Sequence, residues 1–328
     1  MSIEISIEQA AIDPLRSSVE LPRRITLYPL GFPLLLETNS ENVIRAALDS
    51  WAEFPQGFDE PPAQLSLGVE GESLRLPPPP VFSSRRHLLS IVSDPQNTVF
   101  CDMQTGFGFG WVTENVAAAR PFFRYHFLDA AALMLIAELY LTPVHGALIE
   151  RGGQGVLLCG DSFAGKSTLA YACARSGWTL ISDDGTFLVR RREDCYGIGN
   201  PFSLRFREDA RLLFPELSSH LTGLRPNGKA AIEVATRELP EIATATGAIV
   251  NHVVFLNRYA GGNARLTTLS RSEALNRLQG LPVAGLESVR EEHRQAYRRL
   301  LTGGVWQLNY GDLRSAVERL DILAARGN

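Results

Sequence analysis

The chain has 328 residues, 45% of them hydrophobic and 21% charged, which is the composition of a globular protein with one large or two ordinary domains. Its formal net charge of -4 at pH 7 argues against a nucleic-acid-binding protein, because such proteins usually carry a basic excess. The 4 cysteines include no Cys-x-x-Cys pair, so neither a disulfide framework nor a zinc site is expected, and a reducing cytoplasm fits best.

The first 120 residues divide into a leader and a small mixed domain. Residues 1–23 are polar and lack a basic segment followed by an apolar run, so they are expected to form a flexible leader and not a signal peptide. Residues 24–120 indicate an α+β accessory domain. Strand patterns at 24–37, 63–71, 87–94, 97–103 and 106–113 accompany a helix that begins after a cap at Ser40. Residues 74–84 predict a proline-rich connector.

Residues 121–328 are expected to form a second domain with a helical carboxyl terminus. A helix over about 125–141 is apolar but falls short of the roughly 20 residues of a membrane span, so it predicts a buried core helix and no membrane association. Two strand-like runs, 146–150 and 155–159, are joined by "RGGQ", which is typical of a hairpin. Further strands are predicted at 186–191, 230–236 and 252–257, and helices near 207–214, 270–281, 285–302 and 311–327.

A phosphate-binding loop is predicted at residues 160–167, "GDSFAGKS", which match G-x4-G-K-[S/T] between a strand and a helix. Gly160 and Gly165 allow the backbone to turn its N–H groups inward, and the next helix presents its positive end to the same cavity. Lys166 can reach the phosphates of ATP, and Ser167 can bind magnesium. The chain has 30 arginines and only 2 lysines, so a lysine at this position indicates that the site needs the chemistry of an ammonium group. The residues expected to contact ATP are Gly160, Asp161, Ser162, Phe163, Ala164, Gly165, Lys166, Ser167 and Thr168.

Two aspartates follow the next predicted strand. The helix over about 166–176 should end at Gly177, and "WTLIS" should return as a strand parallel to 155–159 through a right-handed crossover. Asp183 and Asp184 then emerge at the carboxyl edge of the sheet, beside the loop. A carboxylate there can bind magnesium or accept a proton from an attacking hydroxyl, and an acidic surface turn is the alternative. Strand 252–257 ends in Asn257, where an ordinary ATPase has an aspartate, and this disfavours a motor-type ATPase.

These residues resemble the carboxyl-terminal catalytic domain of the HPr kinase/phosphorylase family and its HPr-kinase-related relatives. That family shows a His-Gly pair, a strand hairpin, a loop of form GDSxxGKS and two aspartates after the next strand. The matching segments here are "VHGALIE", "GDSFAGKST" and "ISDD", within about residues 143–190. The resemblance implies an α/β fold with a P-loop kinase core of the HPr kinase/PEP carboxykinase type, preceded by the smaller α+β domain.

The resemblance also implies roles for individual residues. Asp184 would be the base that takes the proton from a target serine, and Lys166 would steady the transferring phosphoryl group. His145 would lie in the active site, with a structural turn residue as the alternative. Ser167 and Asp183 would hold Mg²⁺.

A later loop of the resembled family contributes an arginine to catalysis. Arg225 and Lys229 are the two candidates for that role in this chain. The family's glycine-rich segment with a metal-binding glutamate has no clear counterpart in residues 197–210, so the resemblance does not extend to phosphorolysis or to recognition of HPr.

The functional prediction is an ATP-dependent, magnesium-dependent kinase of the cytoplasm. The acceptor would be a hydroxyl, first a serine of a small protein or peptide, or else a hydroxyl metabolite. A P-loop nucleotide hydrolase is the second hypothesis, and a catalytically inactive nucleotide-binding sensor or scaffold is the third. No nucleic-acid partner is expected, and a homo-oligomer remains open.

Overall fold

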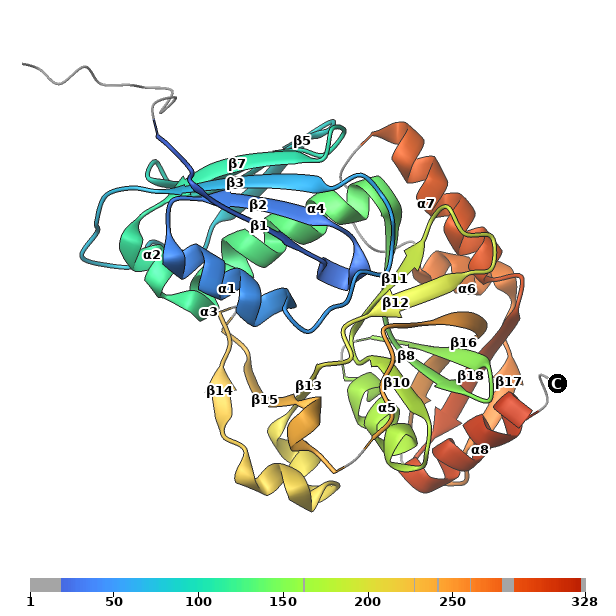
Figure 1. Cartoon of the computed structure of the whole chain (residues 1–328). Helices are drawn as coiled ribbons and strands as arrows, with labels where there is room; N and C mark the ends of the chain where they lie inside the picture. The colour runs from blue at the N-terminus through green and yellow to red at the C-terminus, as the bar shows by residue number, and fades with distance from the viewer. Residues whose placement is uncertain are drawn as a thin grey trace, which may run out of the picture.

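The computed structural model of the protein describes residues 19–161, 163–226, 228–240, 242–259, 261–278 and 286–325. Ser162 of the predicted phosphate loop and residues 1–18 of the predicted leader lie outside the described residues. The described chain is a mixed α/β structure with three sheets (Figure 1).

The first sheet has seven strands and is built almost entirely from the first 112 residues. Its strands in spatial order are β1 (Arg23–Leu27), β2 (Leu34–Thr38), β3 (Ala63–Val69), β7 (Phe107–Val112), β6 (Asn97–Asp102), β5 (Leu88–Asp94) and β4 (Val81–Arg85). Strands β2, β3 and β7 are parallel, and the other neighbours are antiparallel. The connector expected over 74–84 therefore ends at residue 80, because Val81–Arg85 pairs with β5 as an edge strand.

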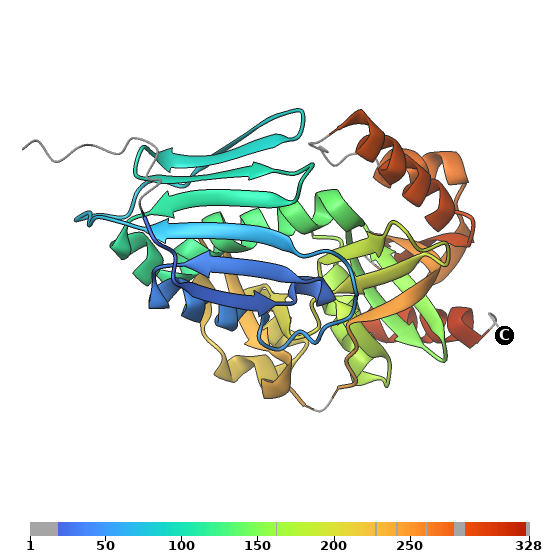
Figure 2. The same cartoon turned by 45° about the horizontal axis from the view of Figure 1, so that its top comes forward.

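Helices cover one face of this sheet, and the other face carries no helix (Figure 2). The covering segments are η1 (Pro29–Gly31), α1 (Glu41–Trp51), α2 (Glu114–Ala118), α3 (Arg120–Phe123), the π-helical turn η2 (Arg124–Leu128) and α4 (Asp129–Tyr140). Helix α1 begins after Ser40, whose Oγ accepts a hydrogen bond from the N–H of Asn42 at 3.2 Å, so the predicted cap is confirmed. The open face carries Phe100, Phe107 and Phe109 in neighbouring positions.

The second sheet surrounds the predicted phosphate loop. Its strands in spatial order are β10 (Thr179–Ser182), β8 (Leu141–Arg151), β11 (Gly185–Val189), β12 (Tyr196–Gly199), β16 (Gly247–Arg258), β18 (Gly304–Tyr310) and β17 (Arg265–Thr268), with β9 (Gln154–Cys159) paired to β8 and β16. The hairpin β8–β9 is confirmed. Strand β10 has the direction predicted for it, but it is not a neighbour of β9, because the long β8 lies between them and pairs antiparallel with both.

Helices pack on both faces of β9, so this strand is buried on both sides. Val156 and Leu158 face the helices α5 (Lys166–Arg175) and α8 (Leu313–Ala325). Leu157 and Cys159 face α6 (Arg271–Leu278) and α7 (Glu287–Leu300) on the other side. A strand in this position reads as a continuous apolar run, which explains why "GVLLC" lacks alternation.

The expectation of an all-helical carboxyl terminus is wrong in one element. Residues 304–310, "GVWQLNY", form β18, which runs parallel to β16 between α7 and α8. Strand β18 is paired on both edges, and its seven residues give only a weak periodic signal beside two long helical patterns.

A small third sheet projects from the second. It consists of β13 (Ser203–Phe206), β15 (Ala230–Ala235) and β14 (Thr222–Leu224), with the short 3-10 helices η3 (Glu208–Leu212), η4 (Pro215–Ser219) and η5 (Thr236–Glu238). The short helix expected near 207–214 is therefore a 3-10 turn.

The hydrophobic packing links the amino-terminal segment to the rest of the chain. Helix α4 packs in the core of the first sheet, and so do Val189 and Ile198 from the second sheet. The division of the chain at residue 120 stays a prediction. Within the described residues, no helix is long and apolar enough to cross a bilayer.

Candidate functional site

The phosphate loop lies between the end of β9 and the start of α5, as the sequence predicts. Among its described residues, three have a positive φ: Gly160 at +154°, Phe163 at +79° and Gly165 at +92°. A Cβ at Gly165 would collide with the hydroxyl of Tyr310, which itself donates to the carbonyl of Ala164 at 2.7 Å. Glycine is therefore required at position 165 by conformation and by space.

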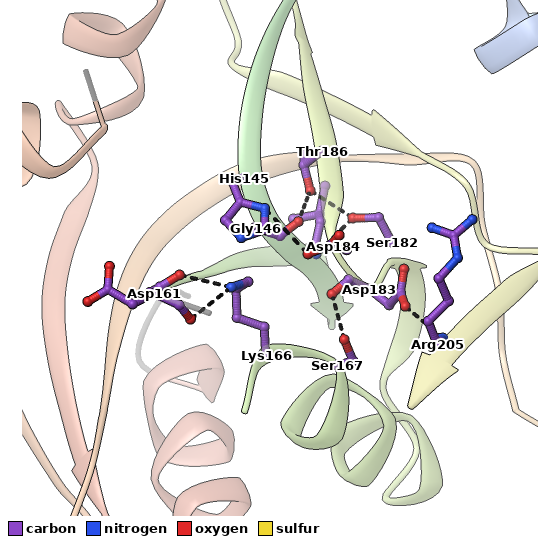
Figure 3. A network of polar contacts seen from close by, with 12 residues as sticks. His145, Gly146, Asp161, Lys166, Ser167, Ser182, Asp183, Asp184, Thr186 and Arg205 are labelled. Atoms are coloured by element: carbon purple, nitrogen blue, oxygen red, sulfur yellow. Dashed lines mark hydrogen bonds and ion pairs between the residues drawn. The ribbon is translucent and has the colours of Figure 1, made fainter. Parts of the chain in front are cut away.

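Lys166 is buried at the first turn of α5, and its side chain points back into the loop (Figure 3). Its Nζ donates to the carbonyl of Gly160 at 2.8 Å and to that of Asp161 at 3.2 Å. Burial lowers the pKa of Lys166, and the nearby carboxylate of Asp184 opposes that shift. The ammonium is thus held among loop carbonyls in a dry site, where an anion would be a strong partner.

Asp183 is almost fully buried, with 6% of its surface accessible. Its Oδ2 accepts a hydrogen bond from the backbone N–H of Arg205 at 2.9 Å, and its main-chain carbonyl accepts one from Ser167 Oγ at 3.2 Å. Burial raises the pKa of Asp183 to about 6, and the charge and N–H of Arg205 limit the rise. Asp183 is the more enclosed of the two predicted aspartates.

Asp184 is open to solvent and paired with His145, as Figure 3 shows. Its Oδ1 lies 3.3 Å from His145 Nδ1, and the two side chains are 51% and 43% exposed, respectively. The pairing follows from strand register, because His145 of β8 lies opposite Gly185 of β11, directly after Asp184. A contact at this distance between an imidazole nitrogen and a carboxylate orients both groups.

The turn that carries the aspartates is held in place by the hydroxyl groups of Ser182 and Thr186, which flank it (Figure 3). Ser182 Oγ and Thr186 Oγ1 are 2.7 Å apart, and Thr186 Oγ1 donates to the carbonyl of Gly146 at 2.9 Å. Ser182 Oγ also accepts the N–H of Leu148 at 3.1 Å. These buried bonds tie β10 and β11 to β8, so the positions of Asp183 and Asp184 are set by the sheet.

Two cavities adjoin the loop. One, of about 790 Å³, is lined by His145, Gly160, Asp161 and Asn257. Strand β16 extends one residue past the predicted end, to Arg258, and Asn257 Nδ2 donates to Asn309 Oδ1 at 2.6 Å.

The second cavity, of about 750 Å³, runs along α5. Its lining includes Gly165 of the loop and Thr168 of α5, together with Phe214, which lies between η3 and η4. It also includes Tyr310, the last residue of β18, and Leu313, the first residue of α8. Its volume is in the range of small-molecule sites.

Arg225 and Lys229, the two later-loop candidates, lie at the turn between β14 and β15. The N–H of Arg225 donates to the carbonyl of Lys229 at 3.0 Å, and the Arg225 guanidinium lies 5.8 Å from the ring centre of Tyr125. Neither residue lines either cavity beside the loop. The structure therefore does not bring them to the other candidate residues.

The donor set fits a magnesium ion that shares its coordination with phosphate. In the described part of the chain, no group of three or more His, Cys, Asp and Glu side chains could hold a metal ion by itself. Magnesium with nucleotides needs only one or two carboxylates, because phosphate oxygens and water complete its shell. Ser167 and Asp183 are adjacent, although the Ser167 hydroxyl contacts the main chain of Asp183 and not its carboxylate.

Sequence reasoning missed two residues of the site. Arg205 lies on β13, 22 positions after Asp183, and no pattern in its segment indicates that its N–H bonds that carboxylate. Tyr310 reaches the loop from 146 positions away. Contacts of this kind depend on tertiary packing and leave no local signal.

Comparisons with known proteins match part of the chain. No family model matches. The HPr kinase/phosphorylase of Halalkalibacterium halodurans is 36% identical over 87 residues, which are 26% of this chain and 24% of that protein. That of Lactobacillus delbrueckii subsp. bulgaricus is 46% identical over 50 residues, which are 15% of this chain and 16% of that protein. The matches thus span about a quarter or less of these curated relatives, and the resemblance is confirmed over that part.

Comparisons with solved structures also found matches. The Hpr(Ser) kinase/phosphatase from Coxiella burnetii aligns with 56% of this chain and 98% of its own chain, at 13% identity and a TM-score of 0.28. A score this low carries no argument about the fold.

Proposed function

We propose that this chain, 26% of which is similar to an HPr kinase/phosphorylase, is an ATP-dependent kinase that transfers the γ-phosphoryl group to a hydroxyl. The expected acceptor is a serine of a small protein or peptide. The observation that carries the proposal is the convergence of Lys166, Asp183 and the His145–Asp184 pair at the amino-terminal end of α5. Four chemically matched groups, from strand β8, from the turn between β10 and β11 and from helix α5, meet at one edge of the sheet.

In this proposal the loop grips the phosphates of ATP. Its backbone N–H groups, the amino-terminal end of α5 and the Lys166 ammonium provide the positive potential. The cavity of about 750 Å³ that begins at Gly165 and Thr168 has the position and size for the nucleoside. Ser167 and Asp183 would hold a magnesium ion that neutralises phosphate charge when it is bound.

Asp184 would act as the base. The O–H bond of the acceptor breaks and its proton passes to the Asp184 carboxylate, while the oxygen forms a bond to the γ-phosphorus. The bond between that phosphorus and the β–γ bridging oxygen breaks, and ADP leaves with the electron pair. His145 would orient the carboxylate through its ring N–H, and Lys166 would offset charge on the moving phosphoryl group.

The cellular setting follows from the cysteines. All 4 are unpaired, and three of them are buried. We place the reaction in a reducing cytoplasm, because unpaired thiols persist there.

The test measures phosphoryl transfer from labelled ATP, with magnesium, to serine peptides and hydroxyl metabolites. We expect Asp184→Asn to lower the transfer rate by about 10²–10⁴-fold while ATP binding is retained, since only proton removal is lost. Lys166→Ala should lower both binding and transfer. Asp59→Asn, at an exposed position outside the site, is the matched control for loss of one carboxylate.

Other outcomes would identify the alternatives. ATP loss at an undiminished rate without any phosphorylated acceptor would indicate a hydrolase. Tight ATP binding without turnover would indicate a sensor or scaffold. Transfer undiminished in Asp184→Asn would remove the base assignment.

A further inference from the structure

We propose that the phosphoryl acceptor binds in a cleft between the amino-terminal segment and the two aspartates, and that this acceptor carries a positively charged group close to its hydroxyl. The inference rests on the proposed kinase function. The cleft, called the acceptor cleft below, is the cavity between residues 48–54 with Asp129 on one side and residues 182–185 with Arg205 on the other.

The position of the acceptor cleft argues for this role. Its volume is about 700 Å³, which suits a small molecule or a few residues of peptide and not the surface of a folded protein. Asp183 and Asp184 both line it, whereas the cavity of about 790 Å³ on the loop side is lined by His145, Gly160 and Asp161. Asp184 therefore stands where a hydroxyl from the cleft could approach a phosphate held by the loop.

The amino-terminal segment supplies one wall of the acceptor cleft. The carboxyl end of α1 contributes Trp51 and Phe54, and the latter packs edge-on against Phe202 with ring centres 4.9 Å apart. The segment of unassigned role thus lies against the candidate catalytic aspartates. Because this segment lines the cleft beside the aspartates, it is placed to recognise the acceptor.

The charges of the acceptor cleft favour a cation. Six carboxylates and three guanidiniums line it: Asp49, Glu53, Asp129, Asp183, Asp184 and Glu233, with Arg124, Arg205 and Arg237. Each guanidinium already has a partner. Arg237 pairs with Glu53, Arg205 Nε lies 3.4 Å from Glu233 Oε1, and Arg124 Nε donates to Ser50 Oγ at 2.7 Å. Asp49 is paired with Arg120 at 2.8 Å, and Arg124 has a neutral hydroxyl as its hydrogen-bond partner. Carboxylates still outnumber guanidiniums in the lining, so an anionic acceptor would meet an excess of negative charge in this cavity.

Asp129 is the best-placed partner for the charged group of the acceptor. Its Oδ1 accepts a hydrogen bond from Ser50 at 2.6 Å, while its Oδ2 has Arg124 Nε only at 4.0 Å, beyond hydrogen-bond distance. The side chain of Asp129 is 29% exposed, so a ligand in the cleft can reach it. Partial burial of the carboxylate raises its pKa. A protonated amine at Oδ2 would relieve that cost and leave the acceptor hydroxyl directed toward Asp184.

The test compares three probes of similar size: serinol, glycerol and glycerate. Serinol and glycerol carry two primary hydroxyls beside an ammonium or a hydroxyl, respectively, and glycerate carries one primary and one secondary hydroxyl beside a carboxylate. Binding to the full chain, with magnesium and a non-hydrolysable ATP analogue, is measured by saturation-transfer NMR. We expect serinol to bind about tenfold more tightly than glycerol, and glycerate more weakly than either.

A variant assigns the preference to one carboxylate. Asp129→Asn keeps the shape and the acceptor for Ser50, so we expect serinol to bind about as weakly as glycerol while glycerol affinity is unchanged. Ser50→Ala retains the carboxylate and should retain the preference. A parallel series of short peptides, with serine beside lysine, glutamine or glutamate, shows whether the charged acceptor is a peptide or a free amino alcohol.

The outcomes separate this inference from the kinase proposal. If wild type binds glycerol or glycerate as tightly as serinol, and the peptides likewise show no preference for lysine, the acceptor cleft assignment is overturned. A preference that persists in Asp129→Asn would overturn the role of Asp129. Transfer of labelled phosphate from ATP to the same probes tests the kinase function separately. Transfer without a charge preference would overturn only the assignment of the acceptor cleft. A charge preference without transfer would overturn only the kinase proposal.

Discussion

Asp183 and Asp184 are neighbours in sequence, but 6% of Asp183 is accessible whereas the side chain of Asp184 is 51% exposed. The carboxylate of Asp183 lies beside β13 and accepts a hydrogen bond from the backbone N–H of Arg205, whereas the carboxylate of Asp184 is paired with the imidazole of His145. A buried carboxylate suits a fixed role beside a metal and phosphate. An accessible, oriented one suits proton transfer.

Burial of Asp183 should make stability depend on pH. Its pKa rises from 3.8 to about 6 in the folded state, so the folded chain holds this proton more tightly than the unfolded chain. The contribution of Asp183 to stability should then fall as pH increases from about 4 to about 6, by an amount on the order of 3 kcal/mol, and this penalty should stay constant above that window. Asp183→Asn removes the penalty. Its unfolding free energy relative to wild type should therefore increase between pH 4 and pH 6.

Denaturant unfolding of both proteins over pH 4–8 measures this difference. Asp59→Asn, which also removes one carboxylate, controls for the change in net charge. A difference between Asp183→Asn and wild type that is flat across pH 4–6 would show that Asp183 is not held in a desolvated site.

The sequence predicts these residues unequally. Lys166, Ser167 and the aspartates could be found because a strand, a glycine loop and a helix fix their places within 25 consecutive residues. Arg205 could not, because it contributes a backbone N–H, which every residue type except proline carries. Side-chain identity carries no information about a contact of that kind.

At the scale of elements, the phosphate loop is clamped by strand β18. The Tyr310 hydroxyl donates to Ala164 and occupies the space beside Gly165. Sequence patterning missed this strand, because its seven residues lie between two strongly periodic helices. The position of the loop is thus set partly by an element 150 residues away in sequence.

The clamp predicts a specific rescue. Gly165→Ala should destabilise the protein more than Gly177→Ala, because both residues have positive φ (+92° and +88°) but only Gly165 faces Tyr310. Tyr310→Phe alone should cost about 0.5–1.5 kcal/mol for the lost hydrogen bond. In Gly165→Ala with Tyr310→Phe the collision is removed, so we expect a favourable coupling of about 1 kcal/mol or more in a double-mutant cycle. Strictly additive effects in thermal or denaturant unfolding would mean that the clamp is absent.

At the scale of the whole molecule, the two large sheets share a core. Val189 and Ile198 of the second sheet pack with α4 and the first sheet, and Phe54 meets Phe202 across the acceptor cleft. Local patterns predicted most strands and helices of both parts. They could not predict how the parts meet, because those contacts join segments far apart in the sequence, such as Phe54 and Phe202.

The shared core predicts cooperative unfolding. Differential scanning calorimetry of the full chain should give one transition, because neither part can open without exposing the other. Phe54→Ala should shift that whole transition, at a cost of about 3–5 kcal/mol. Phe100→Ala, on the open face of the first sheet, should change it much less. Two separate transitions in wild type would contradict the shared core.

The central claim is that the loop from Gly160 to Thr168, with Lys166, binds the phosphates of ATP. Isothermal titration calorimetry with a non-hydrolysable ATP analogue and magnesium tests it most directly, with unfolding temperatures confirming that both proteins are folded. We predict that wild type binds at sub-millimolar concentration and that Lys166→Ala binds at least about tenfold more weakly, a loss of about 1.4 kcal/mol. No binding by wild type at millimolar analogue, or equal binding by Lys166→Ala, would contradict the claim.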